Sequence, residues 1–306
     1  MDVIRTASLC KNYGRLPAVD HLEMHVPKGA IYGFIGRNGS GKSTTLKMLC
    51  GLAYPTSGEI RLFDKPVDDA LARRRVGALI EETGAYPTLS GRENLILKAV
   101  AMGLTDEKRR ADEMLGLVGL GTAGGKKVKK YSMGMKRRLG IALALLGSPD
   151  LLLLDEPLNG LDPEGILQLR ALLLRLNREN GVTIVVSSHI LGELEKISTH
   201  YGILQNGRMA AEISAAELQK KCRDYLLVRV NGQEGARRAA VVLEQELGIR
   251  EYEVLPEGEL HILQQADPAA VTAALTGAGI AVQAVSLHRQ ELEDYFLDLM
   301  GGQDHA

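Results

Sequence analysis

The chain of 306 residues carries 37 lysines and arginines against 38 aspartates and glutamates, a formal net charge of −1. Its 45% hydrophobic and 25% charged residues are typical of a globular protein of one large or two smaller domains, which excludes a disordered or fibrous chain. The balanced charge argues against a dedicated nucleic-acid binder, and no apolar run approaches the roughly 20 residues that cross a bilayer. The three cysteines are far apart, so neither a disulfide framework nor a metal cluster is predicted.

Short apolar runs bounded by glycine, proline or polar residues predict buried strands, and helical periodicity fills much of the chain between them. This alternation predicts an α/β fold with a largely parallel core sheet. The strands are expected at Ile31–Ile35, Val76–Ile80, Leu151–Leu154 and Thr183–Ser187, and helices at Leu139–Leu146 and Ile166–Leu176. Residues 88–147 are mostly helical in pattern and predict a helical insertion on this sheet domain.

The pattern changes after residue 218, so we expect a first domain at 1–218 and a second at 219–306, with a hinge around Gln219–Arg223. The second domain shows the order β-α-β-β-α-β, which is that of a small ferredoxin-like α+β unit. Its strands are expected at Tyr225–Val230, Tyr252–Leu255, Leu260–Leu263 and Ile280–Val285, and its helices at 236–247, Ala269–Leu275 and, at the end of the chain, Leu292–Met300.

A phosphate-binding loop is predicted directly after the first buried strand. The segment Gly36–Thr44 fits the pattern of glycine, four residues, then Gly-Lys-Ser/Thr, and it opens an apolar helix. Glycines let the loop curl so that its N–H groups face phosphate oxygens, and the helix N-terminus adds partial positive charge. Lys42 is expected to reach the β- and γ-phosphates and Ser43 to offer a hydroxyl to Mg²⁺. Nucleotide contacts are expected from Gly36, Asn38, Gly39, Ser40, Gly41, Lys42, Ser43 and Thr44.

Two carboxylates follow the run Leu151–Leu154. A buried parallel strand would deliver Asp155 to the carboxyl edge of the sheet, where ligands of such folds bind. Asp155 can hold the Mg²⁺ shell, and Glu156 is placed to polarise an attacking water. Taken alone, the pair could equally be a solvated acidic turn. Beside the phosphate loop, it predicts a nucleoside triphosphatase of the P-loop class.

Further motifs narrow this class. Tyr131–Leu139 precedes the carboxylate strand, Asn159–Asp162 follows it, and Ser187-Ser188-His189 ends the next strand. With these motifs in order, residues 1–215 resemble the ATP-binding subunit of ABC transporters. The resemblance implies an ABC-type ATPase fold with ATP and Mg²⁺ as cofactors.

The resemblance also assigns roles by position. Tyr13 matches the aromatic residue that stacks on adenine, and Ser132 and Gly134 match the signature loop, which contacts the γ-phosphate of ATP held by the other protomer. Asp162 matches the loop that links the two sites across the dimer. His189 matches the histidine that touches the γ-phosphate and is grouped with Lys42 and Glu156 as catalytic.

Two departures from the family pattern stand out. The signature reads Tyr-Ser-Met-Gly-Met rather than Leu-Ser-Gly-Gly-Gln, although Ser132 and Gly134 are kept. Glu81 stands where the family has a glutamine that senses Mg²⁺ and the transporter; a carboxylate is still a hard oxygen ligand, so we expect Glu81 at the metal, unless it only solvates its loop. Both departures resemble the branch that serves bacitracin and lantibiotic immunity exporters.

The resemblance implies particular partners. We expect a separate transmembrane permease, a head-to-tail homodimer of this chain and no nucleic acid, with Lys126–Lys130 read as a solvated loop. The chain would then be cytoplasmic and peripheral, held at the inner face of the membrane through the permease. One alternative is the ATPase of a general ABC-2-type drug or lipid exporter. A less favoured one is a non-transport ABC ATPase acting on ribosomes or DNA.

Overall fold

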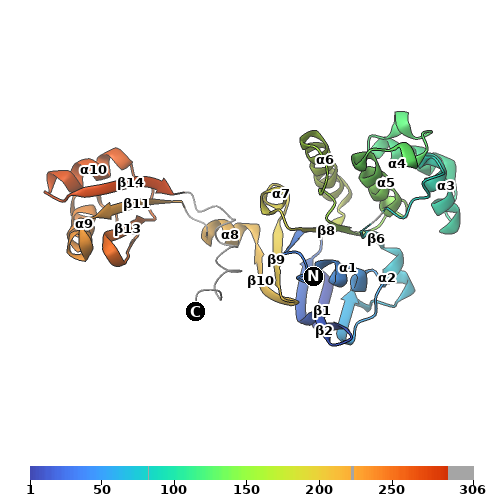
Figure 1. Cartoon of the computed structure of the whole chain (residues 1–306), viewed down its shortest axis with the longest axis horizontal. Helices are drawn as coiled ribbons and strands as arrows, with labels where there is room; N and C mark the ends of the chain where they lie inside the picture. The colour runs from blue at the N-terminus through green and yellow to red at the C-terminus, as the bar shows by residue number, and fades with distance from the viewer. Residues whose placement is uncertain (82, 222–223, 289–306) are drawn as a thin grey trace. The chain divides into compact units, whose positions relative to one another are not determined.

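The computed structural model describes residues 1–81, 83–221 and 224–288. It divides the chain into two compact units, Met1–Ala215 and a second that begins at Ala216, close to the boundary expected after residue 218 (Figure 1). The hinge expected from Gln219 instead begins as helix, because Gln219 lies inside α8 (Ala215–Lys221). The terminal helix expected at Leu292–Met300 falls outside the described residues.

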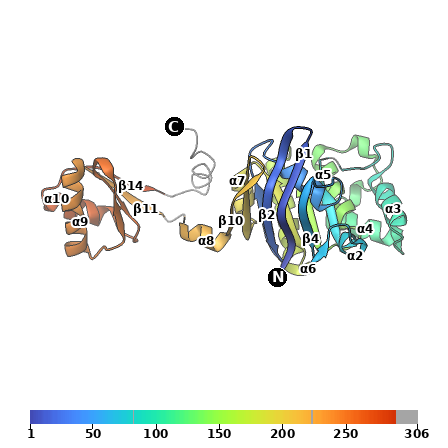
Figure 2. The same ribbon diagram turned by 90° about the horizontal axis from the view of Figure 1, so that it is seen from below.

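The first unit opens with an antiparallel sheet that the sequence analysis missed. Its strand order is β2-β1-β4-β5, and Figure 2 shows β1, β2 and β4 side by side. The strands are β1 (Asp2–Tyr13), β2 (Leu16–Pro27), β4 (Ser57–Leu62) and β5 (Lys65–Pro66). On β2, the buried residues Leu22, Met24 and Val26 alternate with exposed ones, so one face packs on the core.

The second sheet has the order β10-β9-β3-β8-β7-β6. All its strands are parallel except β10, which pairs antiparallel with β9. They are β3 (Ile31–Ile35), β6 (Val76–Leu79), β7 (Leu151–Asp155), β8 (Thr183–Ser188), β9 (His200–Gln205) and β10 (Arg208–Ser214). Every residue of β3, β7 and β8 is buried, which explains why these strands read as continuous apolar runs.

Helix α1 (Lys42–Leu49) joins the two sheets into one core. Its fully buried residues Leu46, Met48 and Leu49 belong to the same apolar cluster as Phe34 of β3 and Leu153 of β7. The remaining helices of this part of the unit are α2 (Ala70–Arg74), α6 (Pro163–Asn180) and α7 (Leu191–Glu195). The core therefore fixes the start of α1 relative to the carboxyl ends of β3 and β7.

The expected helical insertion is present. It contains α3 (Gly91–Ala101), α4 (Glu107–Leu117), the short 3-10 helices Gly121–Ala123 and Val128–Lys130, and α5 (Met133–Leu145). Figure 1 shows α3, α4 and α5 gathered beside β6. A reciprocal capping box between Ser90 and Glu93 defines the start of α3.

The second unit has the expected order of elements and the sheet order β12-β13-β11-β14, with every pair antiparallel. Its core lies between the sheet and the two helices and includes Val228, Leu243, Leu260 and Val271. The elements are β11 (Tyr225–Val230), α9 (Gly232–Leu247), β12 (Tyr252–Val254), β13 (Glu259–Ile262), α10 (Pro268–Gly277) and β14 (Val282–His288). No helix in the described ranges combines the length and apolarity needed to cross a membrane.

Candidate functional site

The predicted phosphate loop connects β3 to α1. Gly41 has φ 109°, and a Cβ there would lie 2.4 Å from the carbonyl oxygen of Ala18 on β2, so only glycine fits this position. Gly39 also has a left-handed backbone, with φ 81°. These two residues curl the loop so that it closes onto the first turn of α1, as the motif requires.

The loop contains a buried polar atom without a partner. The Ser40 Oγ has no hydrogen-bond partner among the described residues, and the residue is 7% exposed. The Lys42 ammonium donates to the carbonyl oxygens of Gly36 at 2.7 Å and Arg37 at 3.2 Å. Buried polar atoms in native proteins are almost always paired, so an unpaired hydroxyl inside a curled glycine-rich loop fits a bound phosphate oxygen.

Lys42, Glu156 and His189 come together from three separate elements. The Glu156 Oε1 lies 3.9 Å from the Lys42 Nζ, and the Glu156 Oε2 lies 2.8 Å from the His189 Nδ1. Glu156 follows β7 with φ 47°, a left-handed backbone that is costly for glutamate and typical of functional sites. The structure therefore gathers the three residues that the sequence predicted as catalytic.

Charge is concentrated in this cluster. Burial lowers the pKa of Lys42, and the carboxylates of Glu156 and Asp155 oppose that fall. The Asp155 Oδ1 accepts a hydrogen bond of 2.6 Å from the Ser187 hydroxyl, and the Ser187 Oγ in turn accepts from the Glu156 N–H at 2.9 Å. The Asp155 carboxylate and the hydroxyl of Ser43, one residue after Lys42, are hard oxygen donors of the kind that Mg²⁺ prefers.

Glu81 has a partner that the sequence did not suggest. Its Oε1 lies 2.5 Å from the Nζ of Lys47 on α1, and its carbonyl oxygen accepts from Arg137 of α5 at 2.8 Å. The pKa of Lys47 is raised, mainly by Glu81 and to a lesser extent by Tyr13 and Asp155. Lys47 is therefore paired with Glu81, and it neutralises the extra negative charge that a carboxylate brings to this position.

Substitution of Glu81 by glutamine tests whether its carboxylate also serves the metal. If the carboxylate leaves Lys47 to approach Mg²⁺, Glu81→Gln should raise the metal concentration for half-maximal ATPase activity about tenfold or more, since contacts to charged groups are each worth about 1.5–3 kcal/mol. Activity titrations with Mg²⁺ and with Mn²⁺ measure this. Unchanged titrations with both metals would limit Glu81 to its pairing with Lys47.

The residues matched to the signature loop and the dimer loop cap two helices. The Ser132 hydroxyl accepts from the Met135 N–H at the start of α5, and Asp162 accepts from the Gly165 N–H at the start of α6. The two loops touch, because a Cβ on Gly134 would lie 3.4 Å from the Leu161 side chain. Ser132 and Asp162 are exposed, and no hydrogen bond or ion pair among the described residues joins either to Lys42 or Glu156.

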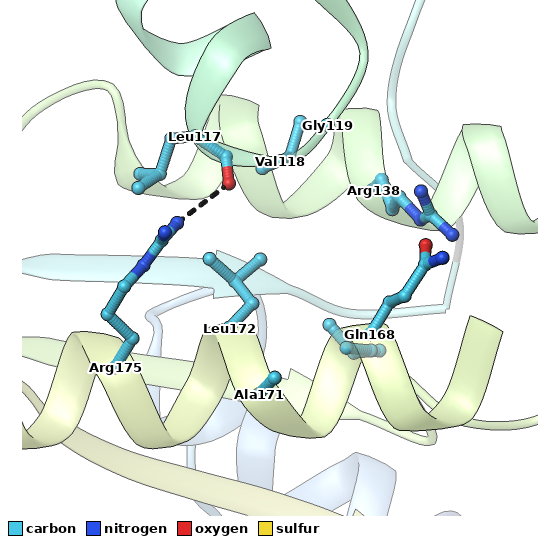
Figure 3. Close-up of a pocket in the computed structure, with 9 residues that line it drawn as sticks. Leu117, Val118, Gly119, Arg138, Gln168, Ala171, Leu172 and Arg175 are labelled. Atoms are coloured by element: carbon cyan, nitrogen blue, oxygen red, sulfur yellow. Dashed lines mark hydrogen bonds between the residues drawn. The ribbon is translucent and has the colours of Figure 1, made fainter. Parts of the chain in front are cut away.

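A cavity of about 360 Å³ lies behind these two loops, between the end of α4, α5 and α6 (Figure 3). Its floor includes Leu172 of α6, and the Arg175 guanidinium crosses it to donate to the carbonyl oxygen of Leu117 at 3.0 Å. Figure 3 shows Arg138 of α5 facing Gln168 of α6 across the gap. None of the predicted site residues lines this cavity. It lies between α5 and α6, the two helices that follow the predicted nucleotide-contact residues Ser132 and Asp162.

Tyr13 ends β1 and is 52% exposed, with the Lys11 ammonium 5.1 Å from its ring centre. An exposed aromatic face is suited to stack on a base. Sequence reasoning missed Lys47, Arg137 and the bridging hydroxyl of Ser187. Only Ser187 carried a usable signal, because it lies two residues before His189 in a recognised motif.

The chain is a P-loop nucleoside triphosphatase by its fold and site. A curled glycine-rich loop leads into α1, and a lysine and a pair of carboxylates at a strand end lie beside that loop. A family model described as ABC transporter matches residues 19–159. The chain is 43% identical over 306 residues to the bacitracin transport ATP-binding protein BcrA of Bacillus licheniformis, and the match covers 98% of each protein.

Two other comparisons agree. The lantibiotic transport ATP-binding protein SrtF of Streptococcus pyogenes is 40% identical over 210 residues, which cover 69% of this chain and 90% of SrtF. A dimeric post-hydrolysis structure of the ATP-binding cassette MJ0796, bound to ADP and Pi, matches with a TM-score of 0.64 at 26% identity, over 69% of this chain and 98% of that one. The chain therefore belongs to the ATP-binding proteins of ABC transporters, and it is an ATPase.

Proposed function

We propose that this chain hydrolyses ATP to power a membrane exporter of peptide antibiotics and so protects the cell that carries it. The observation that supports this assignment is the 43% identity to a bacitracin transport protein over 98% of both chains. That match runs through the ferredoxin-like unit as well as the ATPase unit. The signature Tyr-Ser-Met-Gly-Met and Glu81 also support this assignment, because both resemble the bacitracin and lantibiotic exporter branch.

The chemistry would be divided among the clustered residues. The loop from Gly36 to Thr44 binds the phosphates of ATP, with Lys42 at the β- and γ-phosphates in place of its present contacts to loop carbonyls. Ser43 and Asp155 would hold Mg²⁺, which would supply positive charge next to the phosphate oxygens. Glu156 accepts a proton from the attacking water, and His189, which faces its second oxygen, orients the carboxylate and reaches the γ-phosphate.

A second copy of the chain would complete each site. Ser132 and Asp162 are the N-cap residues directly before α5 and α6, and the start of α5 next to Ser132 is the positive end of a helix dipole, which favours an anion. Because both residues are exposed and make no contact with Lys42 or Glu156 of their own chain, Ser132 is available to a phosphate bound by a partner copy, and Asp162 is available to polar groups of that partner. Two copies in head-to-tail arrangement would then enclose two ATP molecules, with closure on ATP binding and opening after hydrolysis.

The exporter's pore would be a separate transmembrane permease, through which this chain is held at the inner face of the cell membrane. The helical insertion and the adjoining Glu81 segment are the proposed grip on that permease. This position suits Glu81 because its backbone is tied to α5 and its side chain to α1, so the segment contacts both halves of the ATPase unit.

Deletion of the gene, with complementation, tests the proposed function. Cells without the gene should become more susceptible to bacitracin or to a lantibiotic, and a plasmid copy should restore protection. A Glu156→Gln copy should not restore it, because the chain would bind ATP without turning it over. Susceptibility of the same cells to an aromatic drug such as doxorubicin is measured in parallel, to distinguish a peptide-antibiotic exporter from a general drug exporter.

Unchanged susceptibility to both peptide antibiotics, with a change for the aromatic drug alone, would replace this proposal by a general drug exporter. Protection restored equally by the Glu156→Gln copy would remove ATP hydrolysis from the mechanism.

A further inference from the structure

Three side chains of different chemistry converge on the β1–β2 hairpin, outside the nucleotide site. They are Cys10 of β1 and the neighbouring residues Asp20 and His21 of β2. One potential ligand atom from each, a thiol sulfur, a carboxylate oxygen and an imidazole nitrogen, lies within 4.8 Å of the other two. The described part of the chain contains no other such group of three histidine, cysteine or acidic ligands.

An irregularity in the hairpin explains how two consecutive residues face the same side chain. Leu9 pairs with Leu22 and Lys11 pairs with Val19, so Asp20 and His21 together stand opposite the single residue Cys10. In a regular strand, consecutive side chains point to opposite faces. The bulge, with His21 at φ 48°, turns both side chains toward Cys10.

Hydrogen bonds hold the three potential ligand atoms next to one another. The His21 Nδ1 lies 2.5 Å from the Asp20 Oδ1, and the His21 backbone N–H donates to the Cys10 Sγ at 3.2 Å. The second oxygen of Asp20 accepts from the Arg208 guanidinium at 2.7 and 2.8 Å. Arg208 thus holds one carboxylate oxygen and leaves the other facing the imidazole.

We propose that Cys10, Asp20 and His21 bind a zinc-type divalent cation. Sulfur, nitrogen and oxygen donors from three residues, with a fourth position open, form a donor set that Zn²⁺ accepts in tetrahedral geometry. The cation takes the place of the hydrogen bond between His21 Nδ1 and Asp20 Oδ1, so the neutral imidazole binds through Nδ1 and keeps its proton on Nε2. The cation also displaces the thiol proton of Cys10, which passes to solvent. Mg²⁺ prefers oxygen ligands, so this site is chemically distinct from the nucleotide's metal site.

The site is joined to the phosphate loop through the backbone. The Asp20 N–H donates to the carbonyl oxygen of Gly207 at 2.9 Å, and the Gly207 N–H donates to the carbonyl oxygen of Ser40 at 3.0 Å. Cys10 also lies three residues before Tyr13 on β1. A bound cation would therefore fix the strand pair that carries Tyr13 and braces the phosphate loop.

Cobalt(II) provides the direct test, because a thiolate ligand gives Co²⁺ a characteristic charge-transfer absorption. The full chain, reduced and free of nucleotide and chelator, is titrated with CoCl₂ and then with ZnCl₂. We expect one equivalent of Co²⁺ to produce the thiolate band and Zn²⁺ to abolish it. Affinity should rise with pH because binding releases a proton.

Variants assign the signal to this site. Cys10→Ser should remove the thiolate band and Cys50→Ser, the matched control at a half-buried free cysteine, should keep it. Because Cys10 is buried, His21→Asn serves as a second variant: His21 is exposed, asparagine tolerates its left-handed backbone, and the loss of one ligand should weaken Zn²⁺ binding at least tenfold. Arg208→Gln should weaken it about 10- to 100-fold through loss of the contact that orients Asp20.

The proposal is overturned by the absence of a thiolate band in the unmodified chain. It is also overturned by a band that persists in Cys10→Ser, or by Zn²⁺ affinity that is unchanged in His21→Asn. These measurements use no ATP, so their outcome is independent of the proposed transport function.

Discussion

Replacement of Glu156 by glutamine is expected to slow ATP hydrolysis by about 100- to 10,000-fold, the usual contribution of a general base. Glutamine keeps the shape of the side chain between Lys42 and His189 but cannot accept the proton of the attacking water. ATP binding should be preserved, because the phosphate loop is untouched. Phosphate release under saturating MgATP measures the rate, and equilibrium binding of a fluorescent ATP analogue measures affinity.

Glu179→Gln is the matched control, since Glu179 is an exposed glutamate at the opposite end of α6 from Asp162 and belongs to none of the predicted nucleotide contacts. It should hydrolyse ATP at the unmodified rate. A Glu156→Gln chain that also turns over ATP at that rate would show that the proton acceptor is another group.

Replacement of Lys42 by methionine is expected to weaken ATP binding about 10- to 100-fold or more, because charge-assisted hydrogen bonds to phosphate are each worth about 1.5–3 kcal/mol. Methionine preserves much of the buried stem of a residue that is only 5% exposed. The substitution also removes the donor to the carbonyl oxygens of Gly36 and Arg37, so a thermal unfolding curve must accompany the binding measurement.

The exposed Lys28→Met variant provides the control for loss of one positive charge. It should bind ATP normally. Normal ATP affinity in a folded Lys42→Met chain would contradict the assignment of this lysine to the phosphates.

The strands that could be predicted from the sequence are those whose own residues form a clear local pattern. The strands β3 and β11 occupy the predicted residues, and β7 and β8 each extend one residue further, because they are continuous or strongly apolar runs between clear breaks. The strands β1 and β2 were missed. Their half-buried alternation is interrupted by bulges, as at Cys10, and this irregular pattern gives a weak periodic signal.

The residues of the candidate site also fall into those that the sequence could predict and those that it could not. The phosphate loop, Asp155 and Glu156 could be predicted because the chemistry places them at fixed spacing next to a strand. The Lys47–Glu81 pair could not, because it joins a helix to a loop that follows another strand, and nothing local to either residue indicates the contact. The sequence alone suggested a metal role for Glu81 but not the lysine that neutralises its charge.

The distribution of contacts also bears on how the ATPase works. Lys42, Glu156 and His189 already touch within one chain, whereas Ser132 and Asp162 cap helices on an exposed surface. The cavity between α4, α5 and α6 lies behind these two capping residues, and the hydrogen bond between Arg175 and Leu117 crosses it. This arrangement suits a site whose second half is supplied by another copy.

The central proposal is a composite ATP site shared by two copies of the chain. Its most direct test is to measure the mass and the nucleotide content of the Glu156→Gln chain. In saturating ATP, light scattering on a sizing column should show a dimer that retains two ATP molecules, and Ser132→Arg in the same background should leave monomers. A chain that stays monomeric while it binds ATP tightly, or a dimer that is unaffected by Ser132→Arg, would contradict the account.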